Sequence, residues 1–214
     1  MANEMKKCII VSGAPDSDID FIKKSISDDS FLIAADSGYT KLKKIGVKPD
    51  LIIGDFDSSE KPEIDCEIIT LPCAKAYTDT FECVQYAVEH GFNHILILNA
   101  IGSRIDHTYS NILCLDYCRK HGVYCEIKNK NNRITLICDK RIIKKEYDNF
   151  SLFAFLEDCK GVKIRGAGYT AGFYGKEALD ISQGDQFGQS NYVSDDECEI
   201  SLEKGTLLLI ESND

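Results

Sequence analysis

The chain has 214 residues, of which 43% are hydrophobic, enough for a packed core in one large domain or two modest ones. Its 25 Lys and Arg residues against 35 Asp and Glu residues give a formal net charge of -10, which argues against broad attraction to nucleic acid or anionic lipid. The N-terminal segment is too short and too mixed for a signal peptide, and no run of about 18 apolar residues follows. We therefore expect a cytoplasmic globular protein that binds neither nucleic acid nor a membrane.

In the first 128 residues, short apolar runs alternate with segments of helical spacing. Runs rich in Ile, Val or Leu predict strands at residues 8–12, 31–35, 50–54, 67–71, 94–99 and 124–128. Helices are predicted most clearly at 78–90 and 106–121, the second ending at Gly122. Strands that alternate with helices are typical of parallel sheets. Residues 1–128 are therefore predicted to form a doubly wound, Rossmann-like α/β domain.

The pattern changes after the polar segment 128–132, because strands now follow one another without helices. They are predicted at 133–138, 141–145, 150–156, 161–165, 178–181, 197–202 and 206–210. Several of them alternate apolar and polar residues, and glycines separate them. Residues 129–214 are therefore predicted to form a small antiparallel β-sandwich.

Ten cysteines are spread along the chain, and no two of them form a Cys-x-x-Cys pair. A zinc site is therefore not expected. Most of these cysteines fall at apolar positions of predicted strands and helices, where a thiol behaves as a small hydrophobic group. We expect buried free thiols in a reducing compartment rather than a disulfide framework.

The most informative segment is residues 49–58, where a buried strand ends in Asp55 and Asp57, two carboxylates separated by one residue. Ligands of open α/β sheets collect at the carboxyl ends of the strands. Mg²⁺ prefers one or two carboxylates together with substrate phosphates. The pair therefore predicts a site for a nucleotide and its metal ion.

Three further loops place acids at the same edge of the predicted sheet. Asp36 follows the second strand, Asp79 opens a helix after the fourth, and Asp106 follows the fifth. A single Asp in such a loop fits a helix cap or a turn equally well. Acids at the ends of successive strands are better explained by ligands that converge on a metal ion and a polyphosphate. Gly54 and Gly102 would let the backbone approach such a ligand closely.

Arg104 is the candidate partner of a phosphate group, because a guanidinium bridges two phosphate oxygens in a fixed fork. Its alternative role is an exposed ion pair with Asp106 at the start of a helix. His107 has a stronger alternative, since a lone His beside an Asp is more often a structural hydrogen-bonding residue than a catalytic base.

The order and spacing of these motifs resemble the thiamine pyrophosphokinase family over nearly the whole chain. In the first domain the resemblance rests on Ala35-Asp36-Ser37-Gly38, Pro49-Asp50, Gly54-Asp55-Phe56-Asp57-Ser58, Thr78-Asp79 with Glu82, and Gly102-x-Arg104-x-Asp106-His107 through Asn111. In the second domain it rests on Gly168-Tyr169, Leu179 and Gly188-Gln189-Ser190-Asn191. Ala76 departs from the family pattern, in which an acid is common at this place.

The resemblance implies transfer of the pyrophosphoryl group of ATP to the hydroxyethyl oxygen of thiamine, which gives thiamine diphosphate and AMP. It also implies that residues 1–128 bind ATP and Mg²⁺ and that residues 129–214 bind thiamine. The thiamine cleft of this family lies between the first domain of one subunit and the second domain of its partner, so a homodimer is implied as well.

Each candidate residue can be given a role on this basis. The catalytic set is Asp36, Asp55, Asp57, Asp79, Arg104 and Asp106, with Asp55, Asp57 and Asp79 as the Mg²⁺ ligands. The expected ATP and phosphate contacts are Ser37, Gly38, Ser58, Lys75, Thr78, Gly102, Arg104 and His107. The expected thiamine contacts are Asp106, Ser190 and Asn191. Asp106 would orient the incoming alcohol or assist removal of its proton, although helix capping explains it equally well.

Two other functions remain open at this point. A nucleotide-sugar glycosyltransferase would use Asp55-x-Asp57 with the same Mg²⁺ and diphosphate chemistry. The sequence would also be compatible with a binding module that senses thiamine or a nucleotide without turnover, if Ala76 indicates that the catalytic site has been lost. The aromatic residues Tyr169, Phe173 and Tyr174 would either stack on the thiazolium ring of thiamine or pack at a subunit boundary.

Overall fold

A computed structural model of the chain describes residues 4–15, 17–56 and 61–214. Asp57 and Ser58, two of the candidate site residues, lie outside the described residues. The chain divides into two compact units, Met1–Lys130 and Asn131–Asp214.

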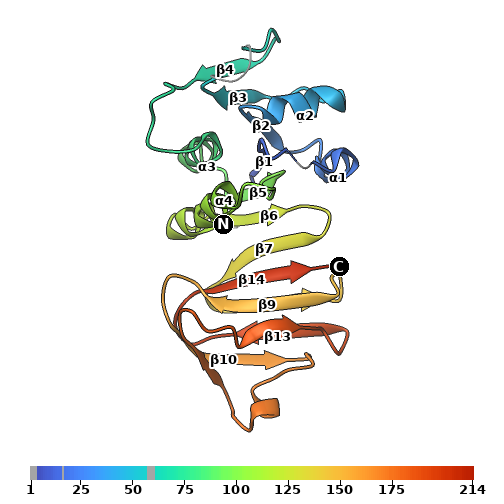
Figure 1. The fold of residues 1–214 in the computed structure, drawn as a ribbon, viewed down its shortest axis with the longest axis vertical. Helices are drawn as coiled ribbons and strands as arrows, with labels where there is room; N and C mark the ends of the chain where they lie inside the picture. The colour runs from blue at the N-terminus through green and yellow to red at the C-terminus, as the bar shows by residue number, and fades with distance from the viewer. Residues whose placement is uncertain (1–3, 16, 57–60) are drawn as a thin grey trace. The chain divides into compact units, whose positions relative to one another are not determined.

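The first unit contains a parallel sheet (Figure 1). Its strands are β1 (Lys7–Val11), β2 (Phe31–Ala35), β3 (Leu51–Gly54), β4 (Glu67–Thr70), β5 (His94–Leu98) and β6 (Tyr124–Lys128). They are ordered β6-β5-β1-β2-β3-β4, and each strand pairs with its neighbour in parallel. Consecutive residues Ile9, Ile10 and Val11 are all buried, as in a strand covered on both faces. This burial explains why the inner strands, such as β1 and β2, are continuous apolar runs in the sequence.

Four helices accompany these strands: α1 (Ile19–Ser25), α2 (Gly38–Lys44), α3 (Asp79–Glu89) and α4 (Ile105–Lys120). Figure 1 shows α1 and α2 on one side of the strands, and α3 and α4 on the other. Ile22 of α1 and Leu42 of α2 share a core cluster with Ile9 and Val11. The third helix contacts β1, β2 and β3. The sequence predicts α3 and α4 most clearly. The helices α1 and α2 have only about two turns each, which is too short to establish a helical period.

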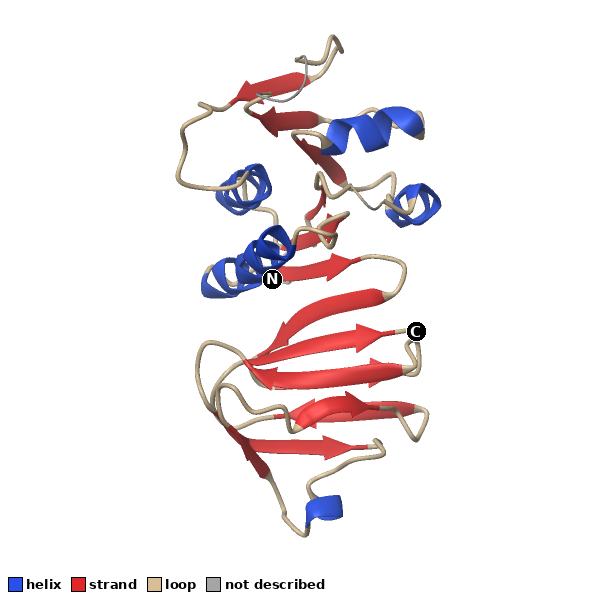
Figure 2. Cartoon of the chain, in the orientation of Figure 1, coloured by secondary structure: helices blue, strands red, loops and turns tan. Residues whose placement is uncertain are grey.

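The second unit is built from antiparallel strands (Figure 2). They are β7 (Asn132–Ile137), β8 (Lys140–Lys144), β9 (Asn149–Ala154), β10 (Cys159–Arg165), β11 (Leu179–Ile181), β12 (Gly188–Asn191), β13 (Glu197–Ser201) and β14 (Leu207–Ser212), with a short 3₁₀ turn, η1 (Gly172–Tyr174). One group has the order β12-β9-β14-β7 and the other the order β11-β10-β13-β8.

One hydrophobic core lies between the two groups of strands. Phe150 and Leu209 belong to it from the first group, and Val162 and Ile200 from the second. The mixed α/β class with antiparallel strands after residue 130 is therefore confirmed. The sequence missed β12, since Gly188-Gln189-Ser190-Asn191 has no apolar alternation.

All ten cysteines are free thiols, and seven of them are buried. Burial raises the pKa of the Cys114 thiol to about 12, which keeps it uncharged and unreactive at neutral pH. In the part of the chain that the structure covers, no helix combines the length and the apolar character needed to cross a bilayer.

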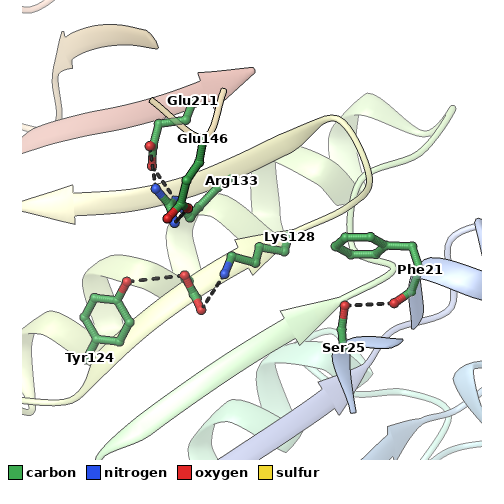
Figure 3. Close-up of polar contacts among 8 residues, drawn as sticks. Phe21, Ser25, Tyr124, Lys128, Arg133, Glu146 and Glu211 are labelled. Atoms are coloured by element: carbon green, nitrogen blue, oxygen red, sulfur yellow. Dashed lines mark hydrogen bonds and ion pairs between the residues drawn. The ribbon is translucent and has the colours of Figure 1, made fainter. Parts of the chain in front are cut away.

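A buried ion pair links two neighbouring strands of the second unit. Arg133 of β7 lies directly opposite Glu211 of β14. Its Nε and Nη2 groups donate to the two carboxylate oxygens of Glu211 at 2.5 Å each, and its Nη1 group donates to Glu146 at 3.0 Å (Figure 3). The side chains of Arg133 and Glu211 are only 13% and 2% exposed. Loss of Arg133 would leave Glu211 as an uncompensated buried charge, whereas loss of Glu211 would still leave Arg133 paired with Glu146.

Replacing Arg133 by Met should therefore lower the free energy of unfolding of the second unit by about 3–5 kcal/mol. The double variant Arg133→Met/Glu211→Leu should recover most of this loss, because it removes both charges. Urea unfolding followed by far-ultraviolet circular dichroism measures both. Glu203→Gln is the control, since its ion pair with Lys163 is exposed and should contribute less than about 1 kcal/mol. A single variant as stable as the double variant would contradict the account.

Candidate active site

A cleft of about 430 Å³ opens at the carboxyl ends of the parallel strands of the first unit. Loops that follow β1, β2, β3 and β5 line it, together with the starts of α3 and α4. Its lining residues are Ser12, Gly13, Ala14, Pro15, Ala35, Asp36, Ser37, Asp55, Thr78, Asp79, Thr80, Ala100, Gly102, Arg104, His107, Thr108 and Asn111. Eight candidate residues from the sequence are among them: Asp36, Ser37, Asp55, Thr78, Asp79, Gly102, Arg104 and His107.

The backbone turns sharply where three of the strands end. Asp36, Phe56 and Asn99 follow β2, β3 and β5 and have φ angles of 44°, 53° and 55°. Residues other than glycine rarely adopt this left-handed backbone conformation. Backbone strain of this kind clusters at functional sites. Asn99 compensates with hydrogen bonds, because its Nδ2 group donates to the carbonyl oxygens of Ser12 at 2.7 Å and Ala14 at 2.9 Å. The loops after β1 and β5 are thereby held together.

Asp36 is held in place through its backbone, while one of its carboxylate oxygens lacks a partner among the described residues. Its N–H group donates to the carbonyl oxygen of Ile53 at 2.8 Å. Its Oδ1 atom is buried and has no hydrogen-bond partner among the residues that the structure describes. A Cβ atom at Gly54 would lie 2.9 Å from Asp36 Cα, so only glycine leaves room for this arrangement. An unpaired buried carboxylate oxygen is costly and suits a site that receives a cation.

Lys75 joins the other two carboxylates of the cleft. Its ammonium group makes a short hydrogen bond to Asp55 Oδ2 and lies 3.2 Å from Asp79 Oδ1. The contact with Asp79 is a charge contact, since this oxygen lacks a well-directed hydrogen bond. Thr78 begins the helix that carries Asp79, and its hydroxyl accepts a hydrogen bond from the N–H group of Phe81 at 3.2 Å. The loop before α3 thus brings Asp79 to the cleft lining and places Lys75, which is not among the lining residues, against two of its acids.

The charges of this group of residues shift their pKa values in opposing ways. Burial raises the pKa of Asp79, with smaller contributions from the negative charges of Asp55 and Asp36, while Lys75 acts in the lowering direction. Burial alone would lower the pKa of Lys75, but the hydrogen bond with Asp55 and the charge contacts with Asp55 and Asp79 outweigh it, so the pKa is raised. Lys75 is therefore a fixed positive charge at neutral pH.

Arg104 and Asp106 pair with each other at the start of α4. The Nη2 group of Arg104 lies 2.5 Å from Asp106 Oδ2 and its Nε group 3.2 Å from Oδ1, and both side chains are exposed. This is the ion pair that the sequence left open as the alternative role of Arg104, although Arg104 also lines the cleft. The hydrogen bond from Arg104 lowers the pKa of Asp106, which makes this carboxylate a weak base in this arrangement.

Sequence reasoning overlooked the loop after β1 and the polar residues beneath it. The hydroxyl groups of Ser12 and Thr80 lie 2.6 Å apart in a buried hydrogen bond, and both residues line the cleft. The rule that ligands collect where strands end applies equally to Ser12 and Gly13, but no acid there drew attention to them. Gly38 begins α2 outside the cleft lining, and a Cβ atom on it would lie 2.0 Å from the carbonyl oxygen of Val11.

The carboxylates of the cleft have the oxygen chemistry that a hard divalent ion requires. Among residues 4–15, 17–56 and 61–214, however, no three His, Cys, Asp or Glu side chains are arranged closely enough to hold a metal ion by themselves. Mg²⁺ usually takes only one or two carboxylates and completes its shell with water and phosphate. The buried, unpartnered Oδ1 atom of Asp36 and the acids held by Lys75 therefore fit such an ion.

The candidate thiamine residues lie in the second unit, at the end of β12. Ser190 is exposed and has a φ angle of 56°, and its N–H group donates to Ser151 Oγ at 3.0 Å. Asn191 is buried, and its amide group bonds to the backbone N–H and carbonyl of Tyr169 and to the N–H of Tyr192. The side chain of Asn191 therefore positions a neighbouring loop.

Exposed aromatic side chains surround that loop. Tyr169 contacts Phe173 edge-on with ring centres 5.2 Å apart, and Tyr174 contacts Phe187 at 4.3 Å. Tyr192 adds a third contact to Tyr169 at 6.1 Å. All five are at least 39% exposed, which is typical of a surface that meets a ligand or a second chain.

Comparisons with known proteins place the chain in a family. Residues 22–127 match the family model described as thiamin pyrophosphokinase, catalytic domain. A thiamine pyrophosphokinase from Bacillus subtilis is 26% identical over 219 residues, which cover 98% of this chain and 100% of that protein. A solved structure of thiamine pyrophosphokinase from Bacillus subtilis has a TM-score of 0.85 at 24% identity, covering 98% of this chain and 100% of that one. A thiamin pyrophosphokinase structure from Geobacillus thermodenitrificans has a TM-score of 0.83 at 22% identity, covering 97% and 98%. The chain belongs to the thiamine pyrophosphokinase family.

Proposed function

We propose that the protein is a thiamine pyrophosphokinase, which transfers the pyrophosphoryl group of ATP to the hydroxyethyl oxygen of thiamine and releases AMP. The observation that carries this proposal is the gathering of Asp36, Asp55 and Asp79 around one cleft in a chain of this family. Attack at the β-phosphorus requires an in-line nucleophile and neutralised phosphate oxygens, so positioning and electrostatics contribute most of the rate.

The acids of the cleft would organise Mg²⁺ and the polyphosphate. We assign Asp55, Asp57 and Asp79 as ligands, with Asp36 acting directly or through water. Bound Mg²⁺ would neutralise phosphate charge and fix the orientation of the triphosphate. Ser37, Gly38, Ser58, Lys75, Thr78, Gly102 and His107 are proposed to contact ATP or its phosphates.

Arg104 would exchange its partner when ATP binds. Its guanidinium group is exposed and paired with Asp106, and a phosphate offers it two oxygens in the same fork geometry. Asp106 would then be released to orient the hydroxyl group of thiamine. This exchange assigns both residues a role without requiring a general base.

The second unit would bind thiamine through Ser190, Asn191 and its exposed aromatic side chains, whose ring faces suit the cationic thiazolium ring. We also infer a cytoplasmic homodimer, in which the thiamine cleft forms between the first unit of one subunit and the second unit of its partner. The first unit would be a doubly wound, Rossmann-like domain, since its strand order reverses between β1 and β5.

Replacing Asp55 or Asp57 by Asn should reduce pyrophosphoryl transfer about 100-fold or more while preserving the fold, because the amide keeps the shape and loses the charge. Purified protein incubated with thiamine, ATP and Mg²⁺ is assayed for thiamine diphosphate and AMP by chromatography. Asp65→Asn is the control, because the Asp65 side chain is exposed and pairs only at the surface with Lys48. Full activity in both variants would reject the assignment.

The same assay separates the other two functions. A glycosyltransferase would release a nucleoside diphosphate from a nucleotide sugar and form no thiamine diphosphate. A binding module would bind thiamine or nucleotide without turnover. Formation of AMP in equal amount to thiamine diphosphate is expected only from the proposed enzyme.

Replacing Ser190 by Ala should raise the KM for thiamine several-fold and leave the KM for ATP unchanged, since one hydrogen bond contributes about 1 kcal/mol. Alanine keeps the positive φ angle at this position about as strained as serine does, so the comparison isolates the hydroxyl group. Ser194→Ala is the control in the same unit, since the Ser194 hydroxyl bonds to Asp195. An equal rise in both KM values would point to general damage.

A further inference from the structure

Lys75 supplies positive charge where the proposed metal ion would act. Its ammonium group contacts Asp55 through a short hydrogen bond and lies 3.2 Å from Asp79. The side chains are well covered, with Lys75 at 11%, Asp55 at 10% and Asp79 at 25% exposure. In this state the single charge of the lysine offsets one of the two negative charges of the proposed metal ligands.

We propose that Lys75 is an internal counter-cation, which holds Asp55 and Asp79 together in the ligand-free protein and transfers its contact to the polyphosphate when metal and nucleotide bind together. The inference rests on the proposed function, because it takes Asp55 and Asp79 as metal ligands. Lys75 would act as a positioning residue that couples the binding of the metal ion to the binding of ATP.

Electrostatics requires such a transfer. A divalent ion held by Asp55 and Asp79 would lie close to the ammonium group of Lys75, and like charges a few ångströms apart in a partly buried site repel strongly. The four-carbon stem of lysine is flexible, so the charge can move without the backbone.

The coupling between metal and nucleotide binding follows from the anionic contacts that are available to Lys75 in each case. A metal ion that binds alone displaces Lys75 from its acids and offers it no new anion. A metal ion that arrives with a triphosphate offers phosphate oxygens in place of the carboxylates. Metal and nucleotide should therefore increase each other's affinity by the same factor, as linkage demands.

The test measures the affinity of Mn²⁺, a paramagnetic substitute for Mg²⁺, by electron paramagnetic resonance. It is carried out with and without an ATP analogue that has a methylene group between its α- and β-phosphates. Lys75→Met should bind Mn²⁺ alone about tenfold or more tightly than the wild type, because the competing charge is gone. The factor by which the analogue strengthens Mn²⁺ binding should fall by about tenfold.

Two further variants make the result specific. Lys128→Met removes a partly buried lysine that pairs with Glu126 outside the cleft lining, and it should leave Mn²⁺ affinity unchanged. Lys75→Arg keeps the charge and should keep Mn²⁺ binding weak in the absence of nucleotide. General structural damage would weaken binding, so a gain in affinity cannot arise from it. If the Met variant fails to fold, Lys75→Gln provides the same comparison.

The outcomes separate this inference from the proposed function. Unchanged or weaker Mn²⁺ binding by folded Lys75→Met, in a protein whose wild type binds Mn²⁺ with the analogue, would overturn the role of Lys75 and leave the proposed enzyme intact. A wild type that binds Mn²⁺ neither alone nor with the analogue would overturn the proposed metal site and this inference together.

Discussion

Three carboxylates share one small cleft, and this concentration of like charge is the constraint on which the first unit depends. Asp36, Asp55 and Asp79 come from distant parts of the chain, and partial burial makes their charges costly unless a cation is near. Lys75 contributes one positive charge and pairs with two of the three acids. The buried Oδ1 atom of Asp36 has no hydrogen-bond partner in the described part of the chain. Such an arrangement suits a ligand that brings further positive charge, as the proposed metal ion would.

The parallel sheet explains how acids so far apart in sequence meet. Its strands run in one direction, so the loops after β1, β2, β3 and β5 emerge at the same edge. The chain turns just after β2, β3 and β5, where Asp36, Phe56 and Asn99 have left-handed backbone conformations. Close approach then requires glycine, as at Gly54 against Asp36. The local strain is balanced by the buried strands behind it, which place the loops firmly.

Much of this arrangement follows from sequence pattern alone, because strands and acids obey simple rules. Apolar runs of five residues fix the strands, and the direction of a parallel sheet brings the acidic loops together. The helices α1 and α2 lack enough turns to show a period, and the four polar residues of β12 resemble a loop. Pattern also does not reveal which polar groups pair with one another.

Three residues illustrate that limit. Arg104 has its charge satisfied by Asp106, two positions along the chain, and a residue list cannot show whether such neighbours meet. Asn191 uses its amide group to hold the backbone of Tyr169. Lys75 was expected to contact phosphate, but its present contacts with Asp55 and Asp79 depend on how the loop before α3 folds back. Side-chain pairing of this kind follows from three-dimensional packing, which short-range pattern does not contain.

The most direct measurement is a crystal structure of the protein with Mn²⁺ and the methylene analogue of ATP, using anomalous scattering to locate the ion. The account predicts an anomalous peak within coordination distance of Asp55 and Asp79, with the triphosphate on the same ion and in the cleft of the first unit. A peak away from these acids, or a triphosphate bound elsewhere on the protein, would contradict it.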